Sequence, residues 1–134
     1  MVNGMIQYRF DCGSGEGLVR VDSIRINNGE WHRIVVERRG NTAELIIDDI
    51  MSSESSAPGT NDVLNLDSND VYFGAEVETL ATGYADIRKG FEGCMKELKI
   101  NSIILPFSGS NTVGTLQKFE EVEFHCKRAY IAGI

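Results

Sequence analysis

Two glutamates near the C-terminus are the residues whose spacing comes nearest to catalytic chemistry. Glu121 and Glu123 are two positions apart in an alternating stretch, so a strand would place both carboxylates on one face with His125. A convergent pair of carboxylates is the machinery of glycoside hydrolysis. No third acid or aromatic sugar platform accompanies them in the sequence, and a charged, solvent-facing side of a strand is the favoured interpretation.

Other catalytic arrangements are weaker still. His32 follows Trp31 in a stretch rich in β-branched residues, and we expect it to be structural and not catalytic. The sequence contains no Gly-x-Ser-x-Gly elbow and no glycine-rich phosphate loop ahead of a helix. We therefore predict that the protein is not an enzyme.

Three cysteines offer a different kind of chemistry. One pair with one spare is the simplest division of an odd count, and Cys94 with Cys126 is the expected pair. In the chain-entropy model, a disulfide that closes the loop from Cys94 to Cys126 stabilises the fold by about 3–4 kcal/mol. Cys12 would then be a free thiol. Three reduced cysteines in a cytosolic protein are the alternative, and a zinc site is disfavoured because neither histidine has a ligand spacing with the cysteines.

Length and charge limit the classes of partner. The chain has 134 residues, a length that favours one domain. Its net charge of −7 disfavours nucleic acid, heparin and anionic membranes as partners, because their negative groups would repel it. No apolar run approaches the roughly 18 residues that a membrane span needs. We therefore expect no direct membrane insertion by this segment.

The N-terminal half alternates in the manner of short strands separated by turns. The most secure hairpin covers residues 31–48, with strands over 31–38 and 42–48 and a turn at Arg39-Gly40-Asn41. Ala43, Leu45 and Ile47 would share its inner face. Earlier strands are expected over residues 5–12 and 18–21, separated by a glycine-rich turn.

The C-terminal half is more mixed, and no window shows a helical stripe. Strands are expected from four apolar stretches, and a polar surface loop is expected after the hairpin. Taken together, the pattern predicts an all-β, antiparallel sandwich with a C-terminal tail or junction over residues 127–134. The expected strands cover residues 64–66, 71–74, 94–100 and 121–126, and the loop covers residues 51–61.

Four segments of the chain resemble the laminin G-like domains of laminins, neurexins, agrin, Slit proteins and large cadherins. The resemblance covers residues 5–126 and includes the stretch Asn-Asn-Gly-Glu-Trp-His-Arg-Ile-Val-Val-Glu-Arg, which is close to the family's most recognisable signature. The matching segments are residues 8–15, residues 27–38, residues 64–66 with 71–74, and residues 90–101 with Cys126.

The resemblance implies an antiparallel sandwich of the concanavalin-like jelly-roll type, spanning residues 1–126 and located outside the cell. Cys94 and Cys126 fall where the family has its two cysteines. A complete domain of this family has strands before the one that contains Tyr8, so we expect this chain to lack its first strands.

Calcium is the cofactor that the resemblance implies. The family holds the ion at one rim with side-chain oxygens from separate loops and two backbone carbonyls, which suits a hard cation. Cys12 falls where the family offers a carbonyl, and Asp67, with Asn65 nearby, falls near a side-chain ligand. A plain Asx-rich turn over residues 67–70 is the alternative.

The function that the resemblance implies is recognition, in a cell-surface adhesion or matrix protein that binds extracellular protein or glycan partners. The contacts would come from rim loops. Arg88 and Lys89 are candidates for an anionic glycan, although two solvated loop charges are the favoured interpretation. A structural spacer with no ligand of its own is the alternative function. The candidate loops cover residues 13–17, 51–62, 67–70 and 76–90.

Overall fold

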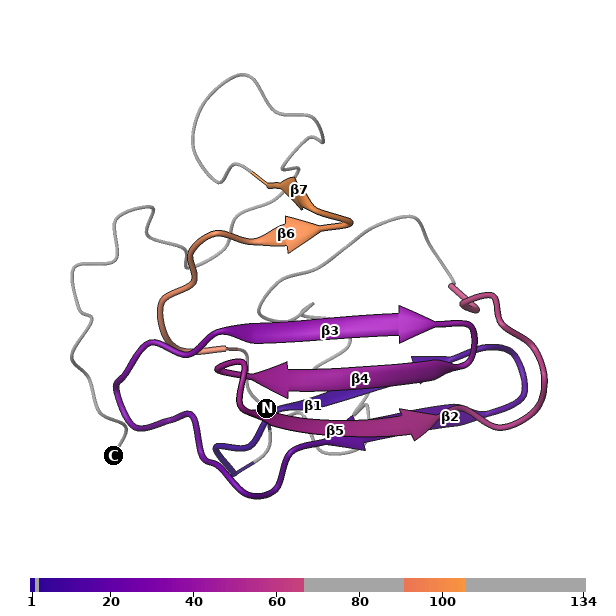
Figure 1. The fold of residues 1–134 in the computed structure, drawn as a ribbon, viewed down its shortest axis with the longest axis horizontal. Coiled ribbons are helices and arrows are strands. Elements are labelled where there is room, and N and C mark those ends of the chain that lie inside the picture. The colour runs from indigo at the N-terminus through magenta and orange to yellow at the C-terminus, as the bar shows by residue number, and fades with distance from the viewer. Residues whose placement is uncertain (2, 67–90, 106–134) are drawn as a thin grey trace. The chain divides into compact units, whose positions relative to one another are not determined.

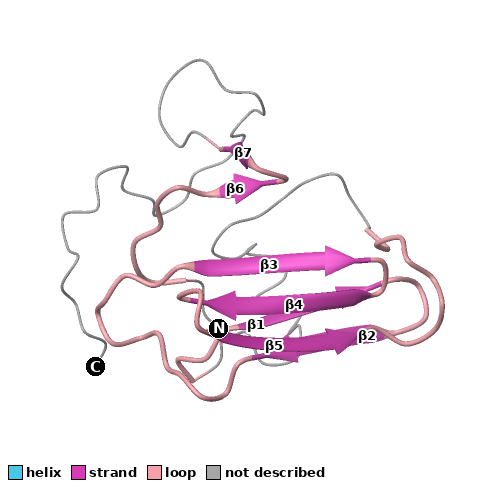
Figure 2. Ribbon diagram, viewed as in Figure 1, coloured by secondary structure: helices cyan, strands magenta, loops and turns pink. Residues whose placement is uncertain are grey.

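A computed structural model describes residues 1, 3–66 and 91–105 (Figure 1). The described elements are all strands (Figure 2), and none of this part of the chain forms a helix that could cross a membrane. Strands β1 to β5 belong to one compact unit, and β6 and β7 belong to a second unit that starts at Glu92.

The first sheet is a two-stranded antiparallel pair of β1 (Gln7–Asp11) and β2 (Glu16–Arg20). The turn between them holds Gly13 and Gly15 at φ of 90° and 122°, a region that glycine enters without steric cost. The Asp11 carboxylate accepts hydrogen bonds from both glycine N–H groups, at 2.5 and 3.3 Å. The predicted loop 13–17 is therefore shorter than expected, because Glu16 already pairs with Asp11 in the ladder.

The second sheet contains β3 (Ile34–Arg39), β4 (Thr42–Ile47) and β5 (Met51–Ser56), in the order β3-β4-β5. It confirms the predicted hairpin, although β3 begins three residues later than expected. Arg33 donates its N–H to the Asp48 side chain at 2.8 Å, and its carbonyl accepts from the Asp48 N–H at 2.9 Å. The backbone before β3 is therefore bonded to the β4–β5 turn.

Strand β5 overturns the prediction of a surface loop over the whole of residues 51–62. Residues 51–56 pair with β4, with Met51 opposite Ile47 and Ser56 opposite Thr42. The burial alternates between half-buried and exposed along this strand, but serine occupies most of its positions and hides the alternation from a hydrophobicity pattern. The connecting loop therefore begins at Ala57.

The second unit is also less regular than predicted. Residues 94–98 are not in a strand, and Glu97 has a φ of 53°, which interrupts the extended backbone expected there. Strands β6 (Lys99–Ile100) and β7 (Ile103–Ile104) form a small hairpin around Asn101 and Ser102. Both turn residues have positive φ, of 48° and 67°, as a tight hairpin turn requires.

The predicted strand over residues 64–66 is absent from the described structure. Leu64 nevertheless packs against the core, and the Asn65 N–H donates to the Asp11 carbonyl at 2.8 Å. The predicted strands over residues 71–74 and 121–126, and the boundary near residue 126, lie outside the described residues.

The two larger sheets pack against each other, with β2 against β5 and β4 (Figure 1). Leu45 and Ile47 are fully buried between them, which confirms the predicted inner face of the hairpin. A Cβ on Gly17 would lie 2.8 Å from the Phe10 ring and 2.9 Å from the Ala57 Cα, so the close approach of the sheets requires glycine there. The core comprises Phe10, Cys12, Val19, Val21, Ala43, Leu45, Ile47 and Ala57.

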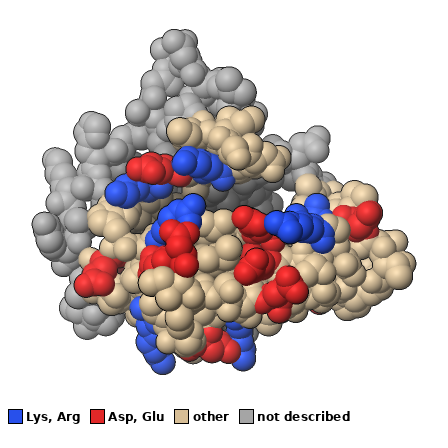
Figure 3. Space-filling view, viewed as in Figure 1, with Lys and Arg blue, Asp and Glu red and all other residues tan. Residues whose placement is uncertain are grey.

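The outer face of the three-stranded sheet carries a row of like charges. Glu37 lies opposite Glu44, and Glu44 lies opposite Glu54, so three carboxylates cross the sheet in register. With Arg39 and Thr42 they line a shallow hollow of about 110 Å³, and acidic side chains gather over this face in Figure 3. Directly opposed like charges destabilise a sheet.

Leu45→Ala is expected to lower the free energy of unfolding by about 2–5 kcal/mol, because it leaves a cavity between the sheets. Urea unfolding followed by circular dichroism measures the change. Ile50→Ala is the control, since Ile50 is 82% exposed and its truncation should change stability by less than about 0.5 kcal/mol. Similar losses in both variants would contradict the packing described above.

Glu44→Gln is expected to raise the free energy of unfolding by about 0.2–1 kcal/mol, because it removes the charge that both neighbours face. The gain should be larger in low salt than in high salt, since exposed charges are screened. Glu16→Gln is the matched control: its carboxylate accepts from Arg9 at 2.8 Å, so neutralising it should not stabilise. Equal effects of the two variants on the free energy of unfolding would show that the three carboxylates do not destabilise the sheet by repulsion.

Candidate recognition rim

Three connecting segments meet at one end of the sandwich. We call them the Gly-Ser-Gly rim, and they comprise residues 12–15, 40–41 and 57–65. A Cβ on Gly15 would lie 3.4 Å from the Pro58 ring, and one on Gly59 would lie 2.7 Å from the Ser14 side chain. Loops that are far apart in the sequence are therefore in contact.

Hydrogen bonds between side chains and backbone hold these loops together. The Asn41 side-chain amide donates to the carbonyls of Gly59 and Ala57, at 2.9 and 3.2 Å, and the Asn41 carbonyl accepts from the Ala57 N–H at 2.7 Å. The Arg38 guanidinium donates to the Asp62 carbonyl at 2.9 Å and to the Gly40 carbonyl. The rim is thus fixed by groups from two strand ends and two loops.

Two members of the predicted calcium set lie at this rim. The Asn65 N–H bonds the carbonyl of Asp11, one residue before Cys12, so the two predicted ligand residues approach each other. Cys12 is a buried, free thiol, as predicted. Asp67, Arg88 and Lys89 lie outside the described residues.

The predicted calcium site needs more oxygen ligands than Cys12 and Asn65 could offer. A carbonyl and an amide oxygen are donors that calcium accepts, but the ion takes six to eight oxygen ligands. Within residues 1, 3–66 and 91–105, no group of three or more histidine, cysteine or acidic side chains is placed to hold a metal. The calcium site with the Cys12 carbonyl and the Asn65 side chain therefore stays a prediction.

Sequence reasoning missed the residues that hold the rim together. Asn41, Asn61 and Arg38 were expected only as parts of a turn, a loop and a strand. Their contacts join segments far apart in the chain: the Asn61 amide, for example, donates to the Ser14 hydroxyl at 3.3 Å. The turn-forming residues around Pro58 and Gly59 marked a loop, but nothing in the sequence marked its partners.

The predicted disulfide is described at one of its two ends. Cys94 is disulfide-bonded, which argues against three reduced cysteines. Cys126, its predicted partner, lies outside the described residues, so the pairing stays a prediction. The candidate carboxylates Glu121 and Glu123 lie outside them as well.

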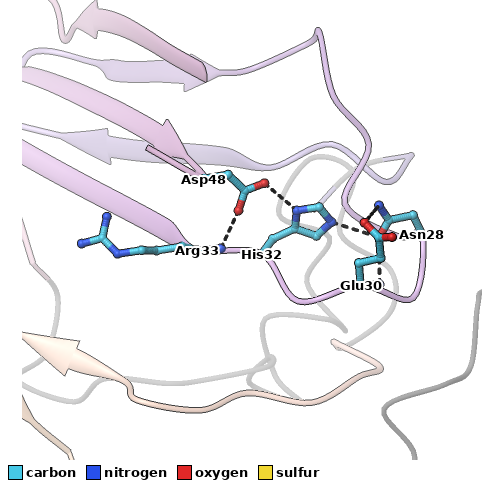
Figure 4. A network of polar contacts seen from close by, with 5 residues as sticks. All are labelled: Asn28, Glu30, His32, Arg33 and Asp48. Atoms are coloured by element: carbon cyan, nitrogen blue, oxygen red, sulfur yellow. Dashed lines mark hydrogen bonds and ion pairs between the residues drawn. The ribbon is translucent and has the colours of Figure 1, made fainter. Parts of the chain in front are cut away.

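A second polar network lies at the opposite end of β3 and β4 (Figure 4). The His32 ring is held between two acceptors, with Nδ1 at 2.8 Å from the Asp48 carboxylate and Nε2 at 2.9 Å from the Asn28 side-chain oxygen. The other Asp48 oxygen accepts the Arg33 N–H. The hydrogen bond from His32, and then that from Arg33, hold the pKa of Asp48 below its ordinary value of 3.8.

Asp48→Asn is expected to remove the part of the free energy of unfolding that the wild-type protein gains from this carboxylate and loses in acid. Because the folded state lowers the pKa of Asp48, its carboxylate stabilises the fold above the ordinary value, and this contribution disappears as the pH falls through the folded value. The difference between wild type and variant in urea unfolding should therefore be full near pH 6 and shrink below about pH 4.

Asp49→Asn is the control for this measurement. Asp49 pairs with the Arg33 guanidinium, and both side chains are more than 60% exposed, a setting in which an ion pair contributes little. A pH-independent difference for Asp48→Asn, or an equal pH dependence in the control, would show that the Asp48 carboxylate does not stabilise the fold as described.

The chain is similar in sequence to a known domain family and to several known proteins. The profile of the Laminin G domain matches residues 1–103. The chain is 48% identical over 130 residues, 94% of its length, to the Fat-like cadherin-related tumor suppressor homolog of Drosophila melanogaster. It is 41% identical over 109 residues, 79% of its length, to Protocadherin Fat 1 of Homo sapiens.

A more distant relative is the Laminin subunit alpha of Drosophila melanogaster, with 26% identity over 97% of the chain. The chain spans 3%, 2% and 4% of the lengths of these three proteins, respectively. No solved structure gives a significant match. The profile match and the all-strand fold of the described residues confirm the predicted fold class, and the relatives confirm the extracellular location: the chain belongs to the Laminin G domain family.

Proposed function

We propose that this domain is an extracellular recognition module that binds a protein or glycan partner through the Gly-Ser-Gly rim. Its family supports a recognition role in adhesion or matrix proteins, and the relatives include a cadherin-related protein and a laminin subunit. The finer assignment to this rim rests on the geometry of its loops.

The observation that carries the proposal is the cross-bonding of the rim. Asn41 ties the β3–β4 turn to residues 57–59, and Asn61 ties the same loop to the glycine turn. Loops that are already ordered lose less conformational entropy when a partner binds. Around these bonds the rim exposes polar side chains, including Thr60 and Asn65, on a rigid two-sheet scaffold.

The proposed partner is not strongly anionic. A net charge of −7 repels sulfated glycans at long range, and Arg88 with Lys89 is a small positive group against that charge. We therefore favour a protein or a weakly charged glycan as the partner. The proposal assigns no catalytic turnover, in keeping with relatives that are named as cadherins, neurexins and a laminin.

We further propose that calcium completes the rim, with the Cys12 carbonyl, the Asn65 side chain and Asp67 among its ligands. The approach of residues 11–12 and Asn65 supports the first two. When bound, the ion would add positive charge to an acidic domain and fix the Asn65 segment against the glycine turn.

Calcium is expected to raise the melting temperature of the 134-residue chain, because an ion that binds only the folded state stabilises it by mass action. Asn65→Ala should weaken this shift, whereas Ser23→Ala, an exposed polar residue between β2 and β3, should leave it unchanged. Differential scanning calorimetry with calcium or with a chelator measures both. A shift of equal size in both variants would exclude Asn65 as a ligand.

Recognition itself is tested by binding of the fluorescently labelled chain to cultured cells. Thr60→Arg places a bulky charge on the exposed rim, and Ser23→Arg places the same charge away from it. The first variant should lose binding and the second should retain it. Equal binding of both would overturn the rim assignment, and no binding by the wild type, with no retention on heparin, would favour the structural spacer.

A further inference from the structure

The His32 ring faces an oxygen acceptor at each of its nitrogens. Asp48 accepts at Nδ1 and Asn28 accepts at Nε2, and the His32 side chain is only 8% exposed (Figure 4). A neutral imidazole donates from one nitrogen and carries a lone pair on the other. The geometry therefore suits the doubly protonated ring, which donates from both.

The orientation of the Asn28 amide is fixed by its other partner. The Asn28 oxygen accepts the Glu30 N–H at 3.0 Å, and the Asn28 amino group lies 3.4 Å from the Glu30 carboxylate. A flipped amide would set its amino group against the Glu30 N–H and its oxygen against a carboxylate. The oxygen of Asn28 is thus the atom that faces His32.

Among the described residues, the charged groups around the ring come from three segments. The β4–β5 turn contributes Asp48 and Asp49, the turn before β3 contributes Glu30, and Arg33 follows His32 in the chain. Both polar groups of Arg33 already have partners: its backbone N–H donates to Asp48 and its guanidinium pairs with Asp49. The pKa of Asp48 is held below its ordinary value of 3.8, so Asp48 stays ionised above about pH 5.

We propose that His32 is a proton-dependent clasp, in which the doubly protonated ring ties the Asn28 turn to Asp48 and releases Asn28 when it loses one proton. The proton that remains stays toward Asp48, because a hydrogen bond to an ionised acceptor is the stronger of the two. The Nε2 lone pair then opposes the Asn28 oxygen, and the turn over residues 27–31 loses its link to the β4–β5 turn.

The clasp would make one end of this extracellular domain sensitive to mild acidification. Histidine ordinarily titrates near pH 6.5, between the pH of extracellular fluid and that of acidified compartments. The turn that it controls carries Glu30 and Trp31, which are exposed at the surface. This inference concerns the end opposite the Gly-Ser-Gly rim, and it does not depend on the proposed function.

Asn28→Ala tests the clasp without disturbing the core, since Asn28 is exposed. At pH 5.5 the variant should have an unfolding equilibrium constant about three- to tenfold larger than that of the wild type. At pH 8.5 the difference between the two proteins should be at least twofold smaller, because only the bond from the Glu30 N–H to Asn28 is then lost. Asn61→Ala is the matched control, because the Asn61 amide bonds the Ser14 hydroxyl and, within residues 1, 3–66 and 91–105, no ionisable side chain. Its effect should be the same at both pH values.

A direct readout is the protonation state of the ring in the folded protein. Nitrogen-15 NMR of the His32 side chain should show both ring nitrogens protonated at pH 5.5, with the Glu30 amide signal shifting as one proton is lost. Asn28→Asp, which keeps an oxygen acceptor, should retain the titration of the Glu30 signal, and Asn28→Ala should lose it. A singly protonated ring at pH 5.5, or equal pH dependence of stability in Asn28→Ala and Asn61→Ala, would overturn the proposal.

Discussion

The close approach of the two larger sheets is the constraint on which the rest of the domain depends. Leu45 and Ile47 are buried because β2 lies against β4 and β5, and β2 can come so near because Gly17 has no side chain. A larger residue there would push the Phe10 ring and the Ala57 backbone apart. The loop that starts at Ala57 would then move away from the glycine turn, so the distance between the sheets also sets the geometry of the rim.

The two ends of these strands are held by different forces. At the Gly-Ser-Gly rim, the amide side chain of Asn41 bonds backbone carbonyls, and the Asp11 carboxylate accepts the N–H groups of Gly13 and Gly15. At the other end, His32, Asp48 and Arg33 form a charged network. The network with a histidine therefore lies at one end, and the strands β3 and β4 separate it from the rim.

The sequence predicted those parts of the fold in which hydrophobic alternation is strong. The hairpin, its buried face and the free Cys12 were anticipated, because apolar residues alternate there with a period of two and the cysteine count is odd. Strand β5 was not predicted because serine is polar and common in loops, so its half-buried positions leave no hydrophobic alternation in the sequence. Propensity says little about a strand whose place depends on its neighbour.

The site was less predictable than the fold, for a related reason. The row of Glu37, Glu44 and Glu54 consists of residues that are visible in the sequence, but only the register of the strands shows that they oppose one another. Likewise, the partners of His32 are sixteen residues later in the chain and four residues earlier, and nothing near His32 in the sequence identifies them. Contacts between distant segments depend on register and turn geometry, which a local pattern does not contain.

Strand β5 has a further consequence, for the behaviour of the protein at high concentration. Among the described strands it is at the border of its sheet, where unpaired backbone groups can recruit strands from other molecules. Its outward side chains are Ser52, Glu54 and Ser56, which bring hydration and a negative charge to that border. The serines that made this strand hard to recognise in the sequence therefore also disfavour edge-to-edge aggregation.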